Sequence, residues 1–316
     1  PDKDDKQWKS TPRQIEFAKM YLTNVVTGKR YIKKLVEDGT VDGWDDPRLV
    51  TIAALRRRGF TTDALKMFVS LSGISKAQSS SDYAMLEYCV REDLKTKVSR
   101  VSAVLDPVKL VIDNYPEGQT ETFTVENNKE APEMGTRGVT FSRELFIERE
   151  DFMEEPPKKY HRLYPGNEVR LMNAYIVTCT GCEKDASGNV TVVHCTYDPD
   201  TKSGSPGADR KVKGTIHWVN ANDANSVAVR VFENLVDEEK GVYNEEDGSV
   251  NINPDSLKTY PDAKTESCLS GARACDRFQF VRSGYYCVDE KDSKPGAPVF
   301  NRIVSLKSSF KLPANP

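Results

Sequence analysis

A small group of cysteines with one histidine holds the residue types best suited to metal chemistry in this sequence. Cys179 and Cys182 form a Cys-x-x-Cys pair, and His194-Cys195 follows after a polar, hairpin-like stretch. Zinc is bound when four such side chains converge. His194 and Cys195 are neighbours in a predicted strand, however, so their side chains point to opposite faces. No second spaced cysteine pair is present. The pattern therefore favours reduced thiols and no metal over the alternative of a zinc site.

Lysine and arginine gather in short clusters, which is the chemistry that holds phosphate groups. The net charge of −3 does not exclude a nucleic acid as partner, because binding depends on where the cations cluster. Ordinary solvated surface charge is the alternative for each cluster. The clusters are Lys29-Arg30 with Lys33-Lys34, Arg56-Arg57-Arg58, Lys158-Lys159-Tyr160-His161-Arg162 and Arg210-Lys211-Val212-Lys213.

Composition sets the broad class of the protein. The 316 residues are 38% hydrophobic and 29% charged, which allows packed cores in two or three domains. No apolar run is long enough to cross a bilayer, so we expect no membrane partner. The odd number of cysteines, seven, and the charged start without an apolar stretch behind it favour a cytoplasmic protein with reduced thiols.

The first hundred residues carry helical signals. Apolar residues recur there at helical spacing between capping residues and glycines. The opening stretch is ambiguous, because Thr11-Pro12 resembles a helix start while Ile15 to Tyr21 also fits a strand. The predicted helices are Gly28 to Glu37, one opened by Asp46-Pro47 and ended by Gly59, one capped by Thr61 or Thr62 and ended by Gly73, and one capped by Ser81 that contains Leu86 and Val90.

Beyond residue 100 the apolar period becomes two, which is typical of strands. Many short strands with polar turns between them, and no alternation with helices, predict one large or two small antiparallel barrels or sandwiches. The predicted strands centre on Val108–Ile112, Val139–Ile147, Val169–Val177, Thr191–Tyr197, Val212–Trp218, Val227–Val231, Phe278–Phe280, Tyr285–Cys287 and Phe300–Leu306.

Seven motifs follow one another in a fixed order: Gly43-Trp44-Asp45-Asp46-Pro47-Arg48, Leu55-Arg56-Arg57-Arg58-Gly59, Val90-Arg91-Glu92-Asp93-Leu94, Leu105-Asp106-Pro107-Val108-Lys109-Leu110-Val111-Ile112, Phe146-Ile147-Glu148-Arg149-Glu150-Asp151-Phe152, Lys213-Gly214-Thr215-Ile216-His217-Trp218-Val219 and Phe278-Gln279-Phe280. This ordered set resembles the glutaminyl-tRNA synthetases and their glutamyl relatives, and the resemblance runs from about Pro12 to about Leu312. The resemblance implies a multidomain fold. Residues 1–99 would hold the end of a catalytic domain and a small α-helical subdomain, with the Rossmann catalytic domain largely absent. Residues 100–316 would form two antiparallel β-barrels that bind the anticodon.

The resemblance also implies an ATP site with Mg²⁺ in the complete enzyme. Gly28, Lys29 and Arg30 stand where the family has its KMSKS-type loop, and Thr27-Gly28 replaces the usual Met-Ser. Lys29 matches the lysine that holds the ATP phosphates, where a preplaced cation stabilises charge on the leaving pyrophosphate. The family's HIGH-type motif has no match around the three histidines. We therefore expect that this chain alone makes no aminoacyl adenylate.

Anticodon recognition is expected from five residues that match the family's base-contacting positions. Arginine and glutamine suit this role because they form paired hydrogen bonds with base edges. His161 and Met172 differ from the lysine and arginine common at their positions. The five residues are Arg100, Arg162, Arg170, Gln279 and Arg282.

The resemblance thus predicts a monomeric part of a glutamine–tRNA ligase, with glutamine, ATP and glutamine tRNA as partners. A glutamyl-tRNA synthetase with the same barrels and a catalytically silent RNA-binding module are the alternatives. For each of these three functions we expect the basic clusters Arg56–Arg58 and Arg210–Lys213 to bind RNA phosphates without distinguishing the base sequence.

Overall fold

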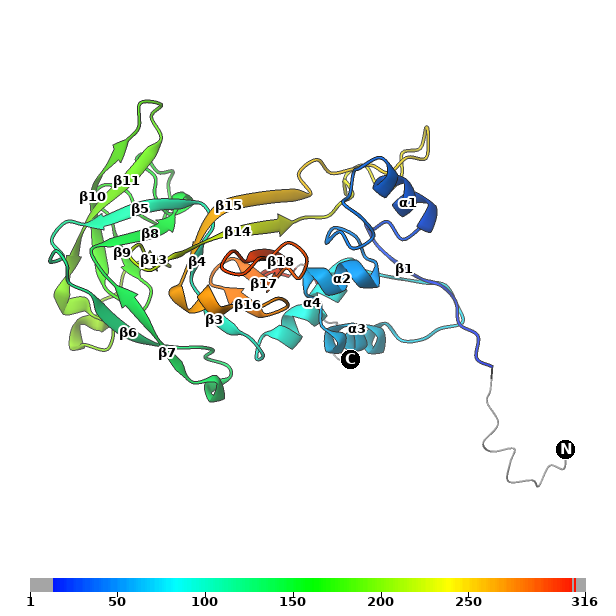
Figure 1. Ribbon diagram of the computed structural model, residues 1–316, viewed down its shortest axis with the longest axis horizontal. Helices are drawn as coiled ribbons and strands as arrows, with labels where there is room; N and C mark the ends of the chain where they lie inside the picture. The colour runs from blue at the N-terminus through cyan, green and yellow to red at the C-terminus, as the bar shows by residue number, and fades with distance from the viewer. Residues whose placement is uncertain (1–13, 309, 311–316) are drawn as a thin grey trace, which may run out of the picture.

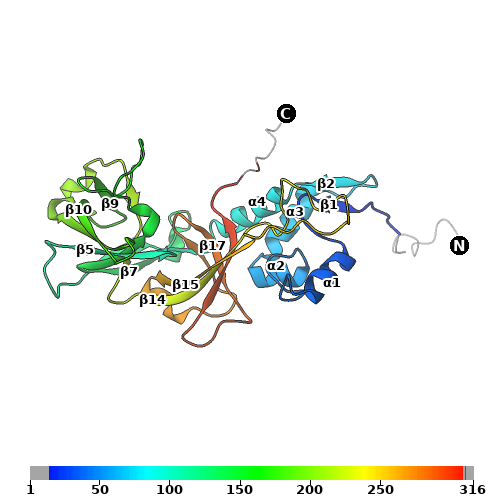
Figure 2. The same cartoon turned by 90° about the horizontal axis from the view of Figure 1, so that it is seen from above.

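The computed structural model describes residues 14–308 and residue 310, and arranges them in three bodies along one long axis (Figure 1). One seven-stranded sheet lies at one end, a second seven-stranded sheet lies in the middle, and the helices lie at the other end. The view from above keeps the same order of bodies (Figure 2). None of the helices among these residues is long and apolar enough to cross a membrane.

The helical body corresponds closely to the predicted helices. Gly59 ends α2 in a left-handed conformation, with φ at 108°, and the Thr61 hydroxyl caps α3 by accepting the Ala64 N–H at 3.2 Å. Beside the helices, β1 and β2 form a small parallel sheet. The elements are β1 (Met20–Leu22), α1 (Lys29–Glu37), α2 (Ile52–Arg58), α3 (Thr62–Ser72), β2 (Ser79–Ser81) and α4 (Tyr83–Leu94).

Two predicted helix starts were wrong. Thr51, not Asp46, caps α2, because the Asp46 carboxylate is already occupied by the Asp42 N–H at 2.9 Å and by the Arg48 side chain. The cap of α4 is Asp82, one residue beyond the predicted Ser81. The predicted start at Thr11-Pro12 lies outside the described residues.

The first sheet curls around one apolar core in the strand order β12-β9-β10-β11-β5-β8-β13. Alternation decides which side chains face that core: Val108, Leu110 and Ile112 are buried, while their neighbours are less so. A separate hairpin of β6 and β7 packs Phe123 and Phe141 against it. The strands are β5 (Pro107–Ile112), β6 (Glu121–Glu126), β7 (Thr136–Phe141), β8 (Glu144–Glu148), β9 (Glu168–Leu171), β10 (Ile176–Lys184), β11 (Val190–Asp198), β12 (Thr215–Ile216) and β13 (Val219–Asn220).

The second sheet has the order β3-β16-β17-β18-β14-β15-β4. The prediction of purely antiparallel barrels was wrong, because each curled sheet is mixed: β5 pairs in parallel with β11, and β14 with β18. The strands are β3 (Ser99–Val101), β4 (Ala103–Val104), β14 (Asn225–Phe232), β15 (Leu257–Thr265), β16 (Arg277–Phe280), β17 (Gly284–Val288) and β18 (Val299–Ser305).

The helical body shares its apolar cores with the second sheet. Leu55 and Leu86 pack in one cluster with Cys287 and Ile303 of that sheet. A second cluster joins α1 to the segment between β14 and β15, through residues such as Ile32. The helices are therefore held against the second sheet by packed side chains.

Candidate nucleic-acid interface

The predicted phosphate loop forms the start of α1. Gly28 is the N-cap residue with φ −70° and ψ 119°, and Lys29 is the first helical residue, with its side chain exposed to solvent. Arg30 is also exposed and donates a hydrogen bond from Nη2 to the Tyr31 hydroxyl at 2.6 Å. Free amides and the helix dipole favour an anion at such an end. Two exposed cations there fit the phosphate end of a nucleotide.

Gly28 is required by a close approach rather than by an unusual φ. A Cβ atom there would lie 2.8 Å from Cδ2 of Tyr31. The Tyr31 ring in turn packs on Tyr243, in the segment between β14 and β15, with 4.5 Å between ring centroids. Through Tyr31, the loop therefore packs on the segment that connects β14 and β15 of the second sheet.

A groove of about 490 Å³ lies between the two sheets and the β6–β7 hairpin. It brings together three of the five predicted anticodon-binding residues, Arg100, Arg170 and Gln279. Met172 and Trp218 also line it, although the Trp218 ring is only 4% exposed and belongs to the core of the first sheet. Arginine and glutamine side chains can form hydrogen bonds with the edge of an unstacked RNA base.

Arg100 and Gln279 are register partners on β3 and β16. Arg100 forms an ion pair through Nη2 with Glu130, whose carboxylate also lies 3.0 Å from Lys95. Nε of Arg100 and Oε1 of Gln279 are both buried, and neither has a hydrogen-bond partner among the described residues. Buried polar atoms are normally paired. This donor and this acceptor therefore remain unpaired in two residues that line the groove.

Arg170 uses its guanidinium to hold the chain that follows β11. It donates hydrogen bonds to the carbonyl oxygens of Thr201, Ala208 and Arg210 at 3.2, 2.7 and 3.2 Å. Its side chain lines the groove but is largely committed to that chain segment.

Arg162 and Arg282 do not line the groove and meet at Asp151 instead. Arg282 forms a two-bond ion pair with the Asp151 carboxylate at 2.6 and 2.8 Å. Arg162 Nε lies 3.2 Å from the same carboxylate. The five predicted residues thus occupy two places. Neither Asp151 nor Glu130 was among the predicted site residues, although Asp151 lies in the motif Phe146–Phe152.

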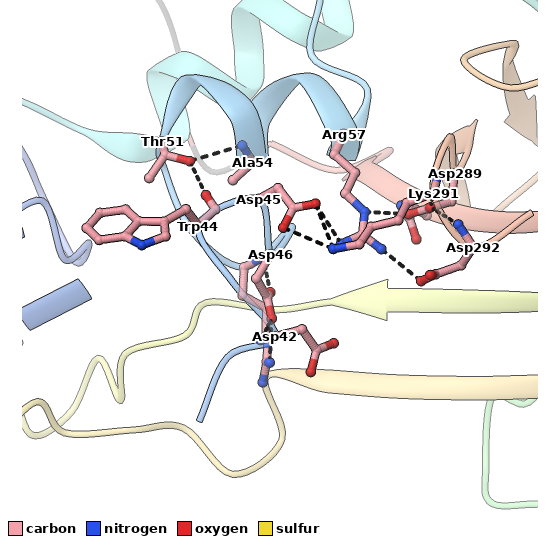
Figure 3. Close-up of polar contacts among 12 residues, drawn as sticks. Asp42, Trp44, Asp45, Asp46, Thr51, Ala54, Arg57, Asp289, Lys291 and Asp292 are labelled. Atoms are coloured by element: carbon pink, nitrogen blue, oxygen red, sulfur yellow. Dashed lines mark hydrogen bonds and ion pairs between the residues drawn. The ribbon is translucent and has the colours of Figure 1, made fainter. Parts of the chain in front are cut away.

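The Arg56–Arg58 cluster does not form one exposed basic surface, so that prediction was wrong for two of its members. Arg57 is buried and pairs with Asp289 at 3.0 Å, Asp292 at 2.8 Å and Asp45 at 3.4 Å (Figure 3). Arg58 is also buried. Arg56 is exposed, so it alone of the three has the accessibility that RNA phosphate requires.

The cysteine cluster divides between two faces of the first sheet. Cys179 and Cys195 are buried register partners, while His194 bonds to Asp113 at 2.8 Å and Glu183 at 3.0 Å near the surface. Within residues 14–308 and 310, no group of three or more histidine, cysteine or acidic side chains has the arrangement of a metal site.

Three family models match the chain in sequence order. The catalytic domain of "tRNA synthetases class I (E and Q)" matches residues 4–96, and two models of the anti-codon binding domain of the same group match residues 98–198 and 215–289. The expectation that the catalytic domain is largely absent is therefore not supported, because residues 4–96 match its model.

Curated relatives are similar over nearly the whole chain. Proteins named glutamine–tRNA ligase from Clostridium kluyveri and Clostridium perfringens are each 51% identical, over 96% and 97% of this chain and 55% of their own length. A protein of the same name from Cupriavidus taiwanensis is 51% identical over 95% of this chain and 51% of its own length. The chain thus spans about half the length of the curated relatives it matches.

Proposed function

The chain belongs to the class I tRNA synthetases for glutamate and glutamine, and from this premise we propose that it is part of a glutamine–tRNA ligase. The proposed activity is the ATP-dependent attachment of glutamine to its tRNA. The observation that carries it is 51% identity, over nearly the whole chain, to proteins named for that reaction. Residues 100–316 would recognise the anticodon, and residues 1–99 would supply the end of the catalytic domain.

The groove between the sheets is the proposed site for an anticodon base. Arg100 Nε and Gln279 Oε1 are one donor and one acceptor without partners among the described residues, and both residues line the groove. A base that enters would gain hydrogen bonds that these buried atoms lack, and a base with the wrong edge would leave them unpaired. The groove therefore supports selective RNA binding.

The loop Gly28–Arg30 is the proposed KMSKS-type loop. Bound ATP would supply the adenylyl group that activates the carboxyl group of glutamine, with pyrophosphate as the leaving group, and Mg²⁺ would accompany the ATP in the complete enzyme. Lys29 would hold the phosphates at the N-terminus of α1, where its charge and the free amides act together. Arg30 would add a second cation, oriented by its hydrogen bond to Tyr31.

The glutamate-specific relatives share the family models, so a glutamyl-tRNA synthetase is the second candidate. Binding to the two tRNAs distinguishes the candidates. We propose that the protein works as a monomer in the cytoplasm, with glutamine, ATP and glutamine tRNA as its partners.

The test is an anisotropy titration of this chain against glutamine tRNA, glutamate tRNA and an anticodon-swapped glutamine tRNA. We expect tightest binding to the first. Arg100→Ala and Gln279→Ala should each weaken cognate binding by about 1–3 kcal/mol and weaken swapped binding much less. Arg143→Ala, which removes a surface arginine paired with Glu117, is the control and should leave the ratio unchanged. Preference for glutamate tRNA, or equal binding of all three RNAs, would reject the proposal.

A further inference from the structure

Asp151 is a fully buried carboxylate between the two sheets. It ends a 3-10 turn, Arg149–Asp151, that follows β8, and 0% of its side chain is exposed. Its backbone carbonyl accepts the Leu163 N–H at 2.9 Å, which places Arg162 next to it. A buried carboxylate requires nearby cations or several donors. Its partners here are two arginines that family resemblance assigns to anticodon recognition.

The contact with Arg282 occupies one complete edge of the guanidinium. Nη1 and Nη2 donate to the two Asp151 oxygens at 2.6 and 2.8 Å. Nη1 also lies 3.2 Å from Nδ1 of His217, whose Nε2 lies 2.9 Å from the Ala103 carbonyl oxygen. Because that carbonyl can only accept, Nε2 carries the proton and Nδ1 is free to accept from Arg282. Asp151 and His217 thus hold both protons of Nη1.

The opposite edge of Arg282 faces no partner among the described residues. The contacts within residues 14–308 and 310 use neither Nε–H nor the second proton of Nη2, and 26% of the side chain is exposed. These two N–H groups are adjacent and nearly parallel, a geometry that suits two acceptors on one edge of a base. The edge taken by Asp151 therefore determines which edge remains available.

Arg162 is anchored by the same carboxylate from the other sheet. Its Nε lies 3.2 Å from Asp151, and its Nη1 lies 3.0 Å from both the carbonyl oxygen and the carboxylate of Glu150. These contacts leave Nη2 available, and 35% of the side chain is exposed. Arg162 precedes β9 of the first sheet, whereas Arg282 lies in the turn between β16 and β17 of the second. Asp151 therefore contacts two arginines that approach from different sheets, and Glu150 holds Arg162 together with it.

The Arg282 backbone supports a fixed placement. Its φ is 64°, in the left-handed region that a non-glycine residue adopts only at an energetic cost. The paired hydrogen bonds with Asp151 offset that cost and hold the side chain in one orientation.

We propose that Asp151 is a positioning residue that orients Arg162 and Arg282 toward the bases of an unstacked RNA segment. Through His217 and Asp151, the Nε edge of Arg282 is presented to a base edge with two acceptors. This inference rests on the proposed anticodon-reading function. It adds that both arginines lose their selectivity together when the shared carboxylate is lost.

The test uses Asp151→Asn, which keeps the shape but places an amide NH₂ against one guanidinium donor. We expect cognate tRNA affinity to fall about tenfold and affinity for an anticodon-swapped tRNA to change less than about twofold. In an Arg162→Ala/Arg282→Ala background the same substitution should add no further loss, because Asp151 acts through those side chains. Asp289→Asn is the matched control, since Asp289 is equally buried against an arginine. It should lower stability and leave the affinity ratio intact.

The possible outcomes distinguish the positioning role of Asp151 from the proposed anticodon-reading function. Equal losses for cognate and swapped tRNA, or a further full loss in the double-alanine background, would overturn the positioning role while leaving anticodon reading in place. If the two arginine substitutions alone leave discrimination unchanged, both the positioning role and these two reading residues are rejected. Should Asp151→Asn not fold, His217→Leu is the second variant. It removes one anchor of Arg282 and should reduce the discrimination between cognate and anticodon-swapped tRNA severalfold; unchanged discrimination would overturn the role.

Discussion

Replacing Arg57 with alanine is expected to destabilise the junction between the helices and the second sheet. Arg57 is 4% exposed, on α2, and its Nε lies 3.0 Å from the fully buried carboxylate of Asp289. Its Nη2 lies 2.8 Å from Asp292 (Figure 3). Removal of the guanidinium leaves Asp289 buried without its nearest cation, which is the expensive way to break an ion pair.

The size of the effect follows from what remains around Asp289. Breaking a buried pair from one side costs about 3–5 kcal/mol. Asp289 keeps backbone N–H donors from Lys291 and Asp292 at 2.8 Å each, and Arg230 lies 3.8 Å away. These contacts place the expected loss near the lower limit, about 3 kcal/mol. The half-exposed partners of Arg57 add at most about 1 kcal/mol.

Urea unfolding followed by tryptophan fluorescence measures this loss as a lower midpoint. Arg56→Ala is the matched control on the same helix, because Arg56 is exposed, and it should stay within about 0.5 kcal/mol of the parent protein. The double variant Arg57→Met/Asp289→Asn removes both charges and should recover part of the loss. A loss below about 1 kcal/mol for Arg57→Ala, or an equal loss for Arg56→Ala, would refute the reasoning.

In the complete enzyme, Lys29→Ala should slow adenylate formation on the order of a hundredfold, measured by pyrophosphate exchange, and should leave tRNA affinity unchanged. Lys33→Ala is the control and should change neither the exchange rate nor the tRNA affinity. The isolated chain should show no glutamine-dependent exchange above a no-protein control. Gly59→Ala should cost about 2–4 kcal/mol in urea, because its Cβ would lie 2.5 Å from Cys287 Cβ at φ 108°, whereas Gly39→Ala at φ 73° meets nothing within 4 Å and should cost about 1 kcal/mol. Burial acts to raise the pKa of Asp289, but backbone N–H groups, an amide and Arg57 outweigh burial and hold that pKa below its ordinary value. The contribution of the ionised Asp289 to stability is complete above about pH 4 and is lost as the pH falls through the folded pKa. The urea midpoint should therefore drop as the solution is acidified below about pH 4. A midpoint that does not change with acid would show that the pairing is absent.

Local signals in the sequence predicted the elements whose determinants are themselves local. Thr61 and Gly59 mark helix ends because capping and left-handed backbone depend on single residues. The buried face of β5 follows from alternation alone. The predicted helix cap at Asp46 was wrong, because the carboxylate of Asp46 can either cap α2 or bond to Arg48, and it bonds to Arg48.

Pairings distant in the sequence were beyond local signals. The parallel register of β5 with β11 joins Leu110 to Val193, and no periodicity within either strand encodes it. Strand β15 was missed because its sequence, with Pro261 in the middle, lacks alternation. Family resemblance selected Arg162 and Arg282 as residues, but their shared contact with Asp151 depends on how two sheets fold against each other.

The shared apolar cores have a practical consequence for dividing the protein into parts. An expression boundary at residue 99 would separate Leu55 and Leu86 from Cys287 and Ile303. It would also separate Ile32 from the segment between β14 and β15 that packs against it. Each half would then expose aliphatic side chains that are buried in the whole protein, and we expect it to aggregate. A protease cut between residues 233 and 256 would weaken the packing of α1 although the cut lies outside that helix. Soluble fragments should therefore keep residues 14 to 308 together.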